Sequence, residues 1–251
     1  MKAITNIDIY DYHKYRPDSY VLFDKQIREV GSMKDFRGAE SVFDGKKALL
    51  MPSLLVGHAH IYGTFFKGIQ LSPFHPQTFT QLLKQLYWRI DGGLDLESSY
   101  YSARISGIEH IKNGVTTLLD HHASGTNIRG TLEELRRGIC DDTGMRALFC
   151  FETSDRFNVD DCIAENLSFA KERSEKHRGL FGLHASLSVN DETLRKVGDV
   201  IGDIPAHVHV AESLEDEVKS LNEYGKRIVH RFKDFGILNE DSILAHCVNI
   251  D

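Results

Sequence analysis

The chain has 251 residues, of which 41% are hydrophobic and 27% charged, and its formal net charge is −7. This is the composition of an ordinary globular protein, and the acidic balance without a basic stripe argues against a nucleic-acid partner. No apolar run approaches the roughly 20 residues of a membrane span, and the N-terminus MKAITNIDIYDYHK lacks the apolar core of a signal peptide. Because the four cysteines show no C-x-x-C spacing, reduced thiols and a cytoplasmic location are expected.

Residues 1–48 are expected to form a small β-rich unit. The stretch SYVLFDKQIREVG predicts two strands joined by a turn at Asp24–Lys25. The stretch SVFDGKKALL predicts a second pair of strands, with a tight turn at Asp44–Gly45.

From residue 49 onward, short apolar runs alternate with helical patterns. Several of the runs are almost continuously apolar, which is typical of parallel strands covered on both faces. The predicted strands are Leu49–Val56, Thr116–His122, Arg146–Glu152, Leu180–Ala185, Ala206–Ala211 and Ile243–Val248. A β-rich entry followed by strand–helix units predicts an α/β fold of the (β/α) barrel type over residues 49–251, although a closed barrel needs about eight strands.

Four helical segments separate these strands. TFTQLLKQLYWRI places its apolar residues on one face, and YSARISGIEHIKNG carries Tyr101, Ile105, Ile108 and Ile111 on one face before it ends at Asn113–Gly114. Two later helices are expected in NDETLRKVGDVIG and SLEDEVKSLNEYGKRIVHRFKDFG.

Histidines stand at the ends of three predicted strands. His58 and His60 lie two residues apart and therefore share a face, His209 ends the fifth strand and His246 the sixth. Catalytic side chains of such barrels come from the carboxyl ends of strands, so these imidazoles are expected to meet at the mouth of the barrel. Each imidazole can give one nitrogen to a metal at about 2.0–2.1 Å, and a divalent ion is expected there. Zinc is the default, while Fe²⁺ or Mn²⁺ would use the same atoms.

Glu212 follows His209 by three residues, just beyond the strand. A carboxylate in this place can hang over the metal and carry protons without binding the ion.

Further residues are candidates for substrate binding. The long excursion Gly63–Asp95 is expected to form a lid, on which Trp88 either stacks on a heteroaromatic ring or packs the helix. Arg156 follows the third strand at the catalytic end, where it either contacts substrate or packs without a site role. Of His121 and His122, one must face inward, where it either orients a ligand or packs the barrel.

The stretches MPSLLVGHAH, FGLHAS, HVHVAES, YGKRIVHRF and ILAHCV together resemble the amidohydrolase superfamily. More narrowly, the chain is similar to the aminohydrolase branch that holds cytosine, guanine and S-adenosylhomocysteine deaminases and the triazine chlorohydrolases. The stretches LYWRID, LLDHHAS, FETSDR and HCVNID are similar to SsnA-type aminohydrolases.

The resemblance implies a (β/α)8 TIM-like barrel and a role for each motif residue. His58, His60 and His209 are the implied metal ligands, Glu212 the general acid and base, and His246 the residue that orients the nucleophilic water. His184 is the implied substrate contact, with a packed strand-end histidine as the alternative. The implied reaction is attack of metal-activated water on an sp² carbon of a nitrogen heterocycle, with release of ammonia. The partner is a small heterocyclic substrate, and a homodimer is left open.

The sequence departs from the family pattern in two places. Met51-Pro52-Ser53 replaces the usual Met-Pro-Gly before the first strand. The family's last ligand, an aspartate at the end of strand eight, has no counterpart, so the resemblance implies a barrel truncated after about six strands. On this interpretation, residues 1–48 are the N-terminal part of a small β-sandwich. A dehalogenase or amidase on the same scaffold, or an incomplete chain acting only as a scaffold, are the alternatives.

Overall fold

The computed structural model describes residues 1–250 and divides into two compact units, one from Met1 to Leu54 and one from Leu55 onward. Each unit is described by itself. Within residues 1–250, no helix combines the length and the apolar character needed to cross a membrane.

The first unit is a five-stranded sheet. Its strands are β1 (Lys2–Tyr10), β2 (Tyr15–Phe23), β3 (Ile27–Ser32), β4 (Ser41–Asp44) and β5 (Leu49–Leu50), with a single 3-10 turn η1 (Met33–Asp35). Alternate side chains of β1 are buried, as the two-residue repeat of a strand requires. Strands β2 and β3 pair antiparallel, which confirms the turn predicted at Asp24–Lys25.

The second predicted strand pair of this unit is wrong. Strands β4 and β5 do not pair with each other; both pair in parallel with β1. The chain between them stays bonded to β1, since Gly45 N donates to Thr5 O and Lys47 N donates to Asn6 O. The Asp44–Gly45 turn therefore joins two segments that both run parallel to β1, and it does not reverse the direction of the chain.

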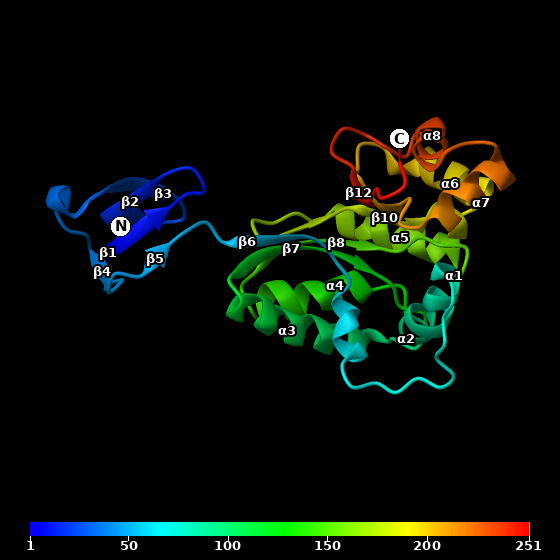
Figure 1. Ribbon diagram of the computed structural model, residues 1–251, viewed down its shortest axis with the longest axis horizontal. Coiled ribbons are helices and arrows are strands. Elements are labelled where there is room, and N and C mark those ends of the chain that lie inside the picture. The colour runs from blue at the N-terminus through cyan, green and yellow to red at the C-terminus, as the bar shows by residue number, and fades with distance from the viewer. Residues whose placement is uncertain (251) are drawn as a thin grey trace. The chain divides into compact units, whose positions relative to one another are not determined.

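The second unit contains two small sheets, and Figure 1 labels β6, β7 and β8 of one and β10 and β12 of the other. One has the order β6-β7-β8-β9 and the other the order β10-β11-β12. The pairs β7–β8, β8–β9, β10–β11 and β11–β12 are parallel. The strands are β6 (Leu54–Ala59), β7 (Val115–His122), β8 (Arg146–Phe151), β9 (His177–Gly179), β10 (Phe181–Ala185), β11 (Ala206–Val210) and β12 (Ile243–His246).

Thr153 and Leu183 form the bridge that connects the two sheets. Thr153 N donates to Gly182 O and His184 N donates to Thr153 O, both at 3.0 Å. Strand β10 corresponds to the predicted strand Leu180–Ala185, whereas β9, which precedes it and pairs with β8, was not predicted. The close approach depends on Gly182, because a Cβ there would lie 2.2 Å from the carbonyl oxygen of Phe151.

Five of the six predicted strands are found within a few residues of their expected bounds. The first is different, because Leu49–Leu50 pairs with β1 and the strand that carries His58 begins only at Leu54. Pro52 lies between the two segments and has no N–H to donate.

Helices follow most strands of the second unit. They are η2 (Ile61–Phe66), α1 (Phe79–Leu82), η3 (Leu83–Tyr87), α2 (Trp88–Asp91), α3 (Leu96–Lys112), α4 (Thr131–Arg136), η4 (Arg137–Asp141), α5 (Val159–Ala170), η5 (Ser186–Ser188), α6 (Asp191–Ile201), α7 (Leu214–Tyr224) and α8 (Ile228–Asp234). Asp95 and Ser98 form a capping box at the start of α3. The last predicted helix is two helices, because Gly225 takes a left-handed conformation after α7.

Helix α3 buries a different face from its apolar one. Its isoleucines and Tyr101 are 42–48% exposed, whereas Ser99, Ser102, Ala103, Ser106 and Gly107 are buried. The small residues of α3 allow neighbouring segments to approach the helix closely. A Cβ on Gly107, for example, would lie only 2.8 Å from the side chain of Thr143. The two larger apolar clusters of this unit lie around Leu118, Leu132 and Phe149 and around Leu194, Val208 and Phe232.

Candidate active site

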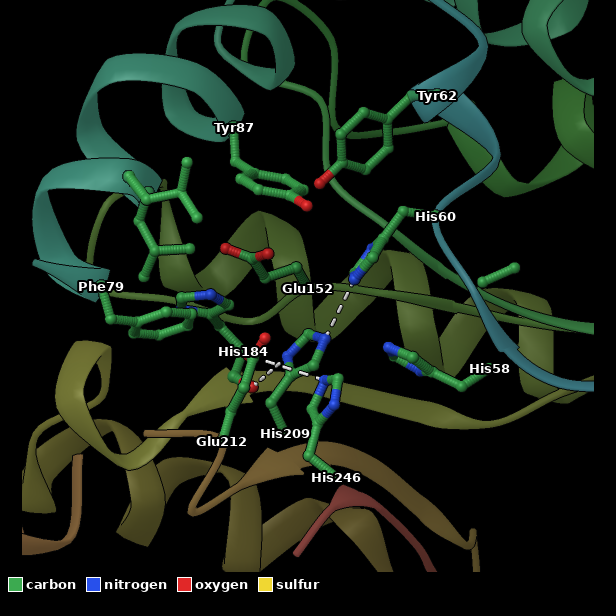
Figure 2. Close-up of a pocket in the computed structure, with 13 residues that line it drawn as sticks. His58, His60, Tyr62, Phe79, Tyr87, Glu152, His184, His209, Glu212 and His246 are labelled. Carbon is green, nitrogen blue, oxygen red and sulfur yellow. Dashed lines mark hydrogen bonds and ion pairs between the residues drawn. The ribbon is translucent and has the colours of Figure 1, made fainter. Parts of the chain in front are cut away.

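A cavity of about 270 Å³ opens where the strands β6, β10, β11 and β12 end. Its lining combines imidazoles, two carboxylates and an aromatic and aliphatic wall (Figure 2). The lining residues are His58, Ala59, His60, Tyr62, Phe79, Leu82, Leu83, Tyr87, Glu152, His184, His209, Glu212 and His246.

The strand ends bring the predicted site residues together. His58 lies in β6 and His60 directly after it, while His184, His209 and His246 come from three neighbouring strands. All five histidines and Glu212 line the same cavity. Parallel strands end at one edge of a sheet, so residues far apart in sequence meet there.

Backbone carbonyls decide which nitrogen of two imidazoles carries the proton. His60 Nδ1 lies 2.7 Å from the carbonyl oxygen of His121, and His209 Nδ1 lies 2.7 Å from that of His184. A carbonyl oxygen only accepts hydrogen bonds, so each Nδ1 must be the donor. The Nε2 atom of each neutral ring then bears a lone pair.

These two lone pairs face each other. The Nε2 atoms of His60 and His209 are 3.1 Å apart, and Figure 2 shows the two rings pointing toward one another. Burial lowers the pKa of His60 to about 4 and that of His209 well below its usual value, so both rings are neutral at pH 7. Two neutral acceptors at this distance need a cation between them. Nitrogens on one tetrahedral zinc ion would be about 3.3 Å apart, so the donor set fits a divalent transition metal.

His58 completes the group of three predicted ligands. Its ring centroid lies 4.9 Å from those of His60 and His209, which are 5.1 Å from each other. Three imidazoles on one ion would show centroid separations of about 5 Å. His58 Nδ1 lies 2.9 Å from His207 Nε2, whereas its Nε2 is buried without a hydrogen-bond partner.

Two sets of three histidines have ligand nitrogens that all lie within 4.8 Å of one another. One consists of His58, His209 and His246, and the other of His60, His121 and His209. His209 belongs to both sets, and neither contains all three predicted ligands.

Glu212 and His246 lie together at the open side of the cavity. Glu212 Oε2 is 3.5 Å from His246 Nε2, and both side chains are about one third exposed. Burial raises the pKa of Glu212, and the nearby His246 partly opposes this. Ala211 and His246 adopt left-handed backbone conformations, with φ of 49° and 74°. Such strained non-glycine residues cluster at functional sites.

Trp88 and Arg156 do not line the cavity. The guanidinium of Arg156 lies 4.6 Å above the Trp88 ring and pairs with Asp91 and Glu152. Trp88 is next to the cavity, with its ring centroid 6.2 Å from that of His184. The structure thus places both side chains behind the cavity wall.

A family model described as the amidohydrolase family matches residues 49–251. The chain belongs to this family.

Curated relatives of this amidohydrolase include two kinds of deaminase. The chain is 29% identical over 217 residues to a 5'-deoxyadenosine deaminase of Methanopyrus kandleri, which covers 82% of the chain and 47% of the relative. It is 28% identical over 234 residues to a 5-methylthioadenosine/S-adenosylhomocysteine deaminase of Desulfitobacterium hafniense, covering 89% and 51%. The amidohydrolase chain thus spans about half the length of these relatives.

Solved structures share its fold. An atrazine chlorohydrolase from Arthrobacter aurescens TC1, complexed with zinc, matches all of the chain and 62% of its own length, with a TM-score of 0.80 at 20% identity. A guanine deaminase from C. acetobutylicum with bound guanine matches all of the chain and 63% of its own length, with a TM-score of 0.81 at 17% identity.

Sequence reasoning missed three lining residues of the amidohydrolase cavity that carry polar groups: Tyr62, Tyr87 and Glu152. Glu152 directly follows β8, so the strand-end rule that selected Arg156 should have selected it as well. Tyr62 lies two residues after His60 and is buried. Tyr87 lies in the helix predicted over TFTQLLKQLYWRI, but it belongs to the π-helical turn η3 within it, and the pattern indicated neither this turn nor a site role for Tyr87.

Proposed function

We propose that this amidohydrolase is a metal-dependent aminohydrolase that removes an amino group from a nitrogen heterocycle of the adenosine or guanine type and releases ammonia. The observation that carries the proposal is the convergence of the Nε2 lone pairs of His60 and His209 beside Glu212, in a cavity lined by five histidines.

The proposed ion would be held by His60 and His209 with a further histidine. When bound, a divalent metal supplies a hydrolytic nucleophile near neutral pH by lowering the pKa of water from 15.7 to about 7. Zinc is the proposed ion, because nitrogen donors with an open position suit it.

Glu212 is the proposed proton carrier. Because burial raises its pKa, the carboxylate is a better base than an exposed glutamate and can take a proton from water at Oε2. It then returns this proton to the ring nitrogen or to the departing amine. His246 lies within 3.5 Å of that oxygen and would hold the attacking water in line.

The cavity suits a flat, nitrogen-rich ring. Phe79, Leu82 and Tyr87 provide apolar contact area, while Glu152 and His184 offer polar groups that can bind ring N–H and nitrogen atoms. The names of the relatives and of the guanine-bound structure support a purine ring in particular.

We also propose that the strands β6 to β12, with β9 and β10 counted as one position, are the first six of an eight-stranded barrel. The assignment of residues 1–48 to a small β-sandwich and of 49–251 to the barrel belongs to the same proposal.

The test compares wild type with Glu212→Gln. Purified, zinc-loaded protein is incubated with 5'-deoxyadenosine, 5'-methylthioadenosine, S-adenosylhomocysteine and guanine, and released ammonia is measured. We expect ammonia from at least one compound, and a rate lower by a factor of about 10²–10⁴ in Glu212→Gln at unchanged zinc content. Turnover that survives in Glu212→Gln would rule out the proton-carrier role. A parallel incubation uses a chlorotriazine, and released chloride is measured. Chloride release there, without ammonia from any of the purine compounds, would favour the dehalogenase alternative.

A further inference from the structure

Two polar groups of the cavity wall have no partner within the described part of the chain. The Tyr62 side chain is 2% exposed and lines the cavity, yet its hydroxyl makes no hydrogen bond with any described residue. Figure 2 shows this hydroxyl pointing into the cavity. The second group is Oε2 of Glu152, a lining residue that is also 2% exposed. Buried polar groups nearly always have a partner, so two open ones in one cavity point to a ligand.

Arg156 fixes which way the Glu152 carboxyl group faces. Its Nη2 donates to Glu152 Oε1 at 2.8 Å and to Asp91 Oδ2 at 2.9 Å. A guanidinium has no acceptor atom and stays charged, so Oε1 must accept. Burial raises the pKa of Glu152, and the neighbouring Arg156 opposes this rise because its positive charge favours the carboxylate. With Oε1 held in this way, Oε2 is left to accept a hydrogen bond from a molecule in the cavity.

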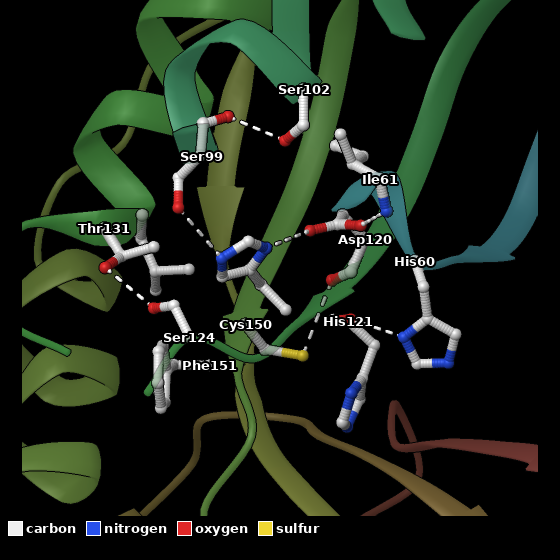
Figure 3. Close-up of polar contacts among 12 residues, drawn as sticks. His60, Ile61, Ser99, Ser102, Asp120, His121, Ser124, Thr131, Cys150 and Phe151 are labelled. Carbon is white, nitrogen blue, oxygen red and sulfur yellow. Dashed lines mark hydrogen bonds and ion pairs between the residues drawn. The ribbon is translucent and has the colours of Figure 1, made fainter. Parts of the chain in front are cut away.

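The backbone in front of Tyr62 is held in place as well. His60 Nδ1 donates to His121 O, and the backbone N–H of Ile61 donates to Asp120 Oδ1 at 2.7 Å (Figure 3). Both residues that precede Tyr62 are therefore tied to β7, and the direction of the tyrosine side chain is set by this attachment.

Tyr62 and Glu152 act on the same part of the cavity. Burial raises the pKa of Tyr62 well above its usual value, and the charge of Glu152 is the next largest cause. The hydroxyl therefore keeps its proton and can donate it. The Tyr62 ring centroid lies 5.5 Å from that of His60, which belongs to the proposed metal site. The cavity thus offers one acceptor and one donor close to the position of the reaction.

An acceptor near a donor matches a ring N–H beside a carbonyl group. In a guanine-type ring the N1–H lies between the carbon that carries the amino group and the carbonyl carbon C6. In an adenosine-type ring N1 has no hydrogen, so a carboxylate facing it would meet a lone pair. Enzymes that bind a single base in a pocket tell bases apart by these edges.

We propose that Glu152 and Tyr62 make this amidohydrolase specific for an oxo-substituted purine ring of the guanine type. The Glu152 carboxylate accepts the ring N–H, and the Tyr62 hydroxyl donates to the adjacent carbonyl oxygen. Arg156 is the positioning residue that leaves Oε2 to the cavity. This rests on the proposed function and narrows its substrate class, which there includes adenosine-type rings. A ring without the N–H and the carbonyl leaves both buried groups unpaired, and such sites reject the wrong ligand strongly.

The test measures the binding of two purines that carry no amino group, so that no ammonia can be released. Hypoxanthine has the N1–H and the C6 carbonyl, whereas 6-methylpurine has a bare N1 and a methyl group at C6. Dissociation constants are measured by isothermal titration calorimetry on the zinc-loaded chain. We expect hypoxanthine to bind about 10–100-fold more tightly, as is typical of hydrogen bonds to a charged group. Equal binding of the two compounds, no binding of hypoxanthine, or tighter binding of 6-methylpurine would overturn the proposal.

Glu152→Gln gives a second readout that a merely structural role would not produce. Arg156 needs an acceptor, so the amide oxygen of the glutamine takes the place of Oε1 and the NH₂ group faces the cavity. The acceptor thereby becomes a donor, and we expect the preference to invert in favour of 6-methylpurine, whose N1 accepts. A Glu152→Gln chain that is folded by circular dichroism and keeps the wild-type preference would overturn the proposal.

Tyr62→Phe removes only the donor. We expect hypoxanthine to bind about 3–10-fold more weakly to it, with 6-methylpurine unchanged. Tyr20→Phe and Glu165→Gln are the matched controls, because Tyr20 of β2 is as little exposed as Tyr62, Glu165 of α5 is a buried carboxyl group, and neither lines the cavity. We expect both controls to bind hypoxanthine as wild type does. The same losses in the controls would overturn the assignment to Tyr62 and Glu152.

The specificity proposal and the proposed function fail separately. A chain that prefers hypoxanthine but releases no ammonia from any compound would refute the proposed reaction and leave the roles of Glu152 and Tyr62 standing. A chain that releases ammonia from 5'-deoxyadenosine and binds the two test purines alike would confirm the reaction and refute these roles.

Discussion

Arg156 is paired with two buried carboxylates, Asp91 and Glu152, and its replacement should show how strongly the free energy of unfolding depends on these ion pairs. Its guanidinium contacts Asp91 at 3.2 and 2.9 Å and Glu152 at 2.8 Å. The carboxylate side chains are only 1% and 3% exposed. In Arg156→Leu both acids lose their cation while they remain buried. Removing one partner of a buried ion pair costs about 3–5 kcal/mol, which is a large part of the stability of a typical domain.

The cost should depend on pH. Burial raises the pKa of Asp91 to about 6 even beside Arg156, and it raises the pKa of Glu152 as well. A carboxyl group with a raised pKa binds protons more tightly in the folded state, so stability falls as pH rises from its ordinary value of 3.8 through about 6. Without Arg156 the pKa values of Asp91 and Glu152 rise further. The fall in folding stability with rising pH then continues to higher pH. The destabilisation of Arg156→Leu should therefore be larger at pH 8 than at pH 5.

Urea unfolding followed by circular dichroism at pH 5 and pH 8 measures both effects. Arg129→Leu is the matched control, because Arg129 pairs with Asp161 at 2.9 Å but its side chain is 58% exposed. We expect the control to change the free energy of unfolding by less than about 1 kcal/mol at either pH. A cost below about 1 kcal/mol for Arg156→Leu at pH 8, or equal costs at the two pH values, would refute the reasoning.

Two further substitutions test close contacts between elements of the second unit. Gly182→Ala should destabilise the fold by about 1–3 kcal/mol or more in the same urea titration, because its Cβ would lie 2.2 Å from Phe151 O. The control Gly93→Ala should cost far less, because its Cβ would have only Ile90 O nearby, at 3.7 Å. Arg231→Lys should lower the free energy of unfolding by about 2–3 kcal/mol although the charge is retained. A single ammonium cannot reproduce the hydrogen bonds of the buried guanidinium to Ser186, Val189 and Asp191. A melting temperature equal to that of wild type would contradict this prediction.

The strand-end rule, together with the family resemblance, predicted the histidines and one of the two carboxylates that line the cavity. His58, His60, His184, His209 and Glu212 were placed at one edge, and all of them line one cavity. The rule works because parallel strands run in one direction, so position in the strand alone selects the edge. It needs no knowledge of how any side chain is turned.

Features that depend on packing between elements could not be predicted in this way. Arg156 follows a strand as expected, but it pairs with Asp91 from a distant helix and with Glu152, and it is not among the residues that line the cavity. Helix α3 has an isoleucine stripe that periodicity would assign to a core, yet its small residues are buried because they let the backbone of neighbouring helices approach. In both cases the partner lies far away in the chain, and local spacing carries no information about it.

The tautomers of His60, His121 and His209 also could not be predicted from local spacing, and they decide which nitrogen of each ring carries a lone pair. The acceptors that fix the N–H groups of His60, His121 and His209 are backbone carbonyls, which exist at every position whatever the side chain. A carboxylate acceptor would also stabilise the imidazolium and raise the pKa of the ring. A carbonyl adds no formal negative charge, so burial keeps the pKa of each ring low and the rings stay neutral. Register between strands, which puts a carbonyl opposite one nitrogen of each ring, thereby leaves the other nitrogen of each neutral ring with a lone pair.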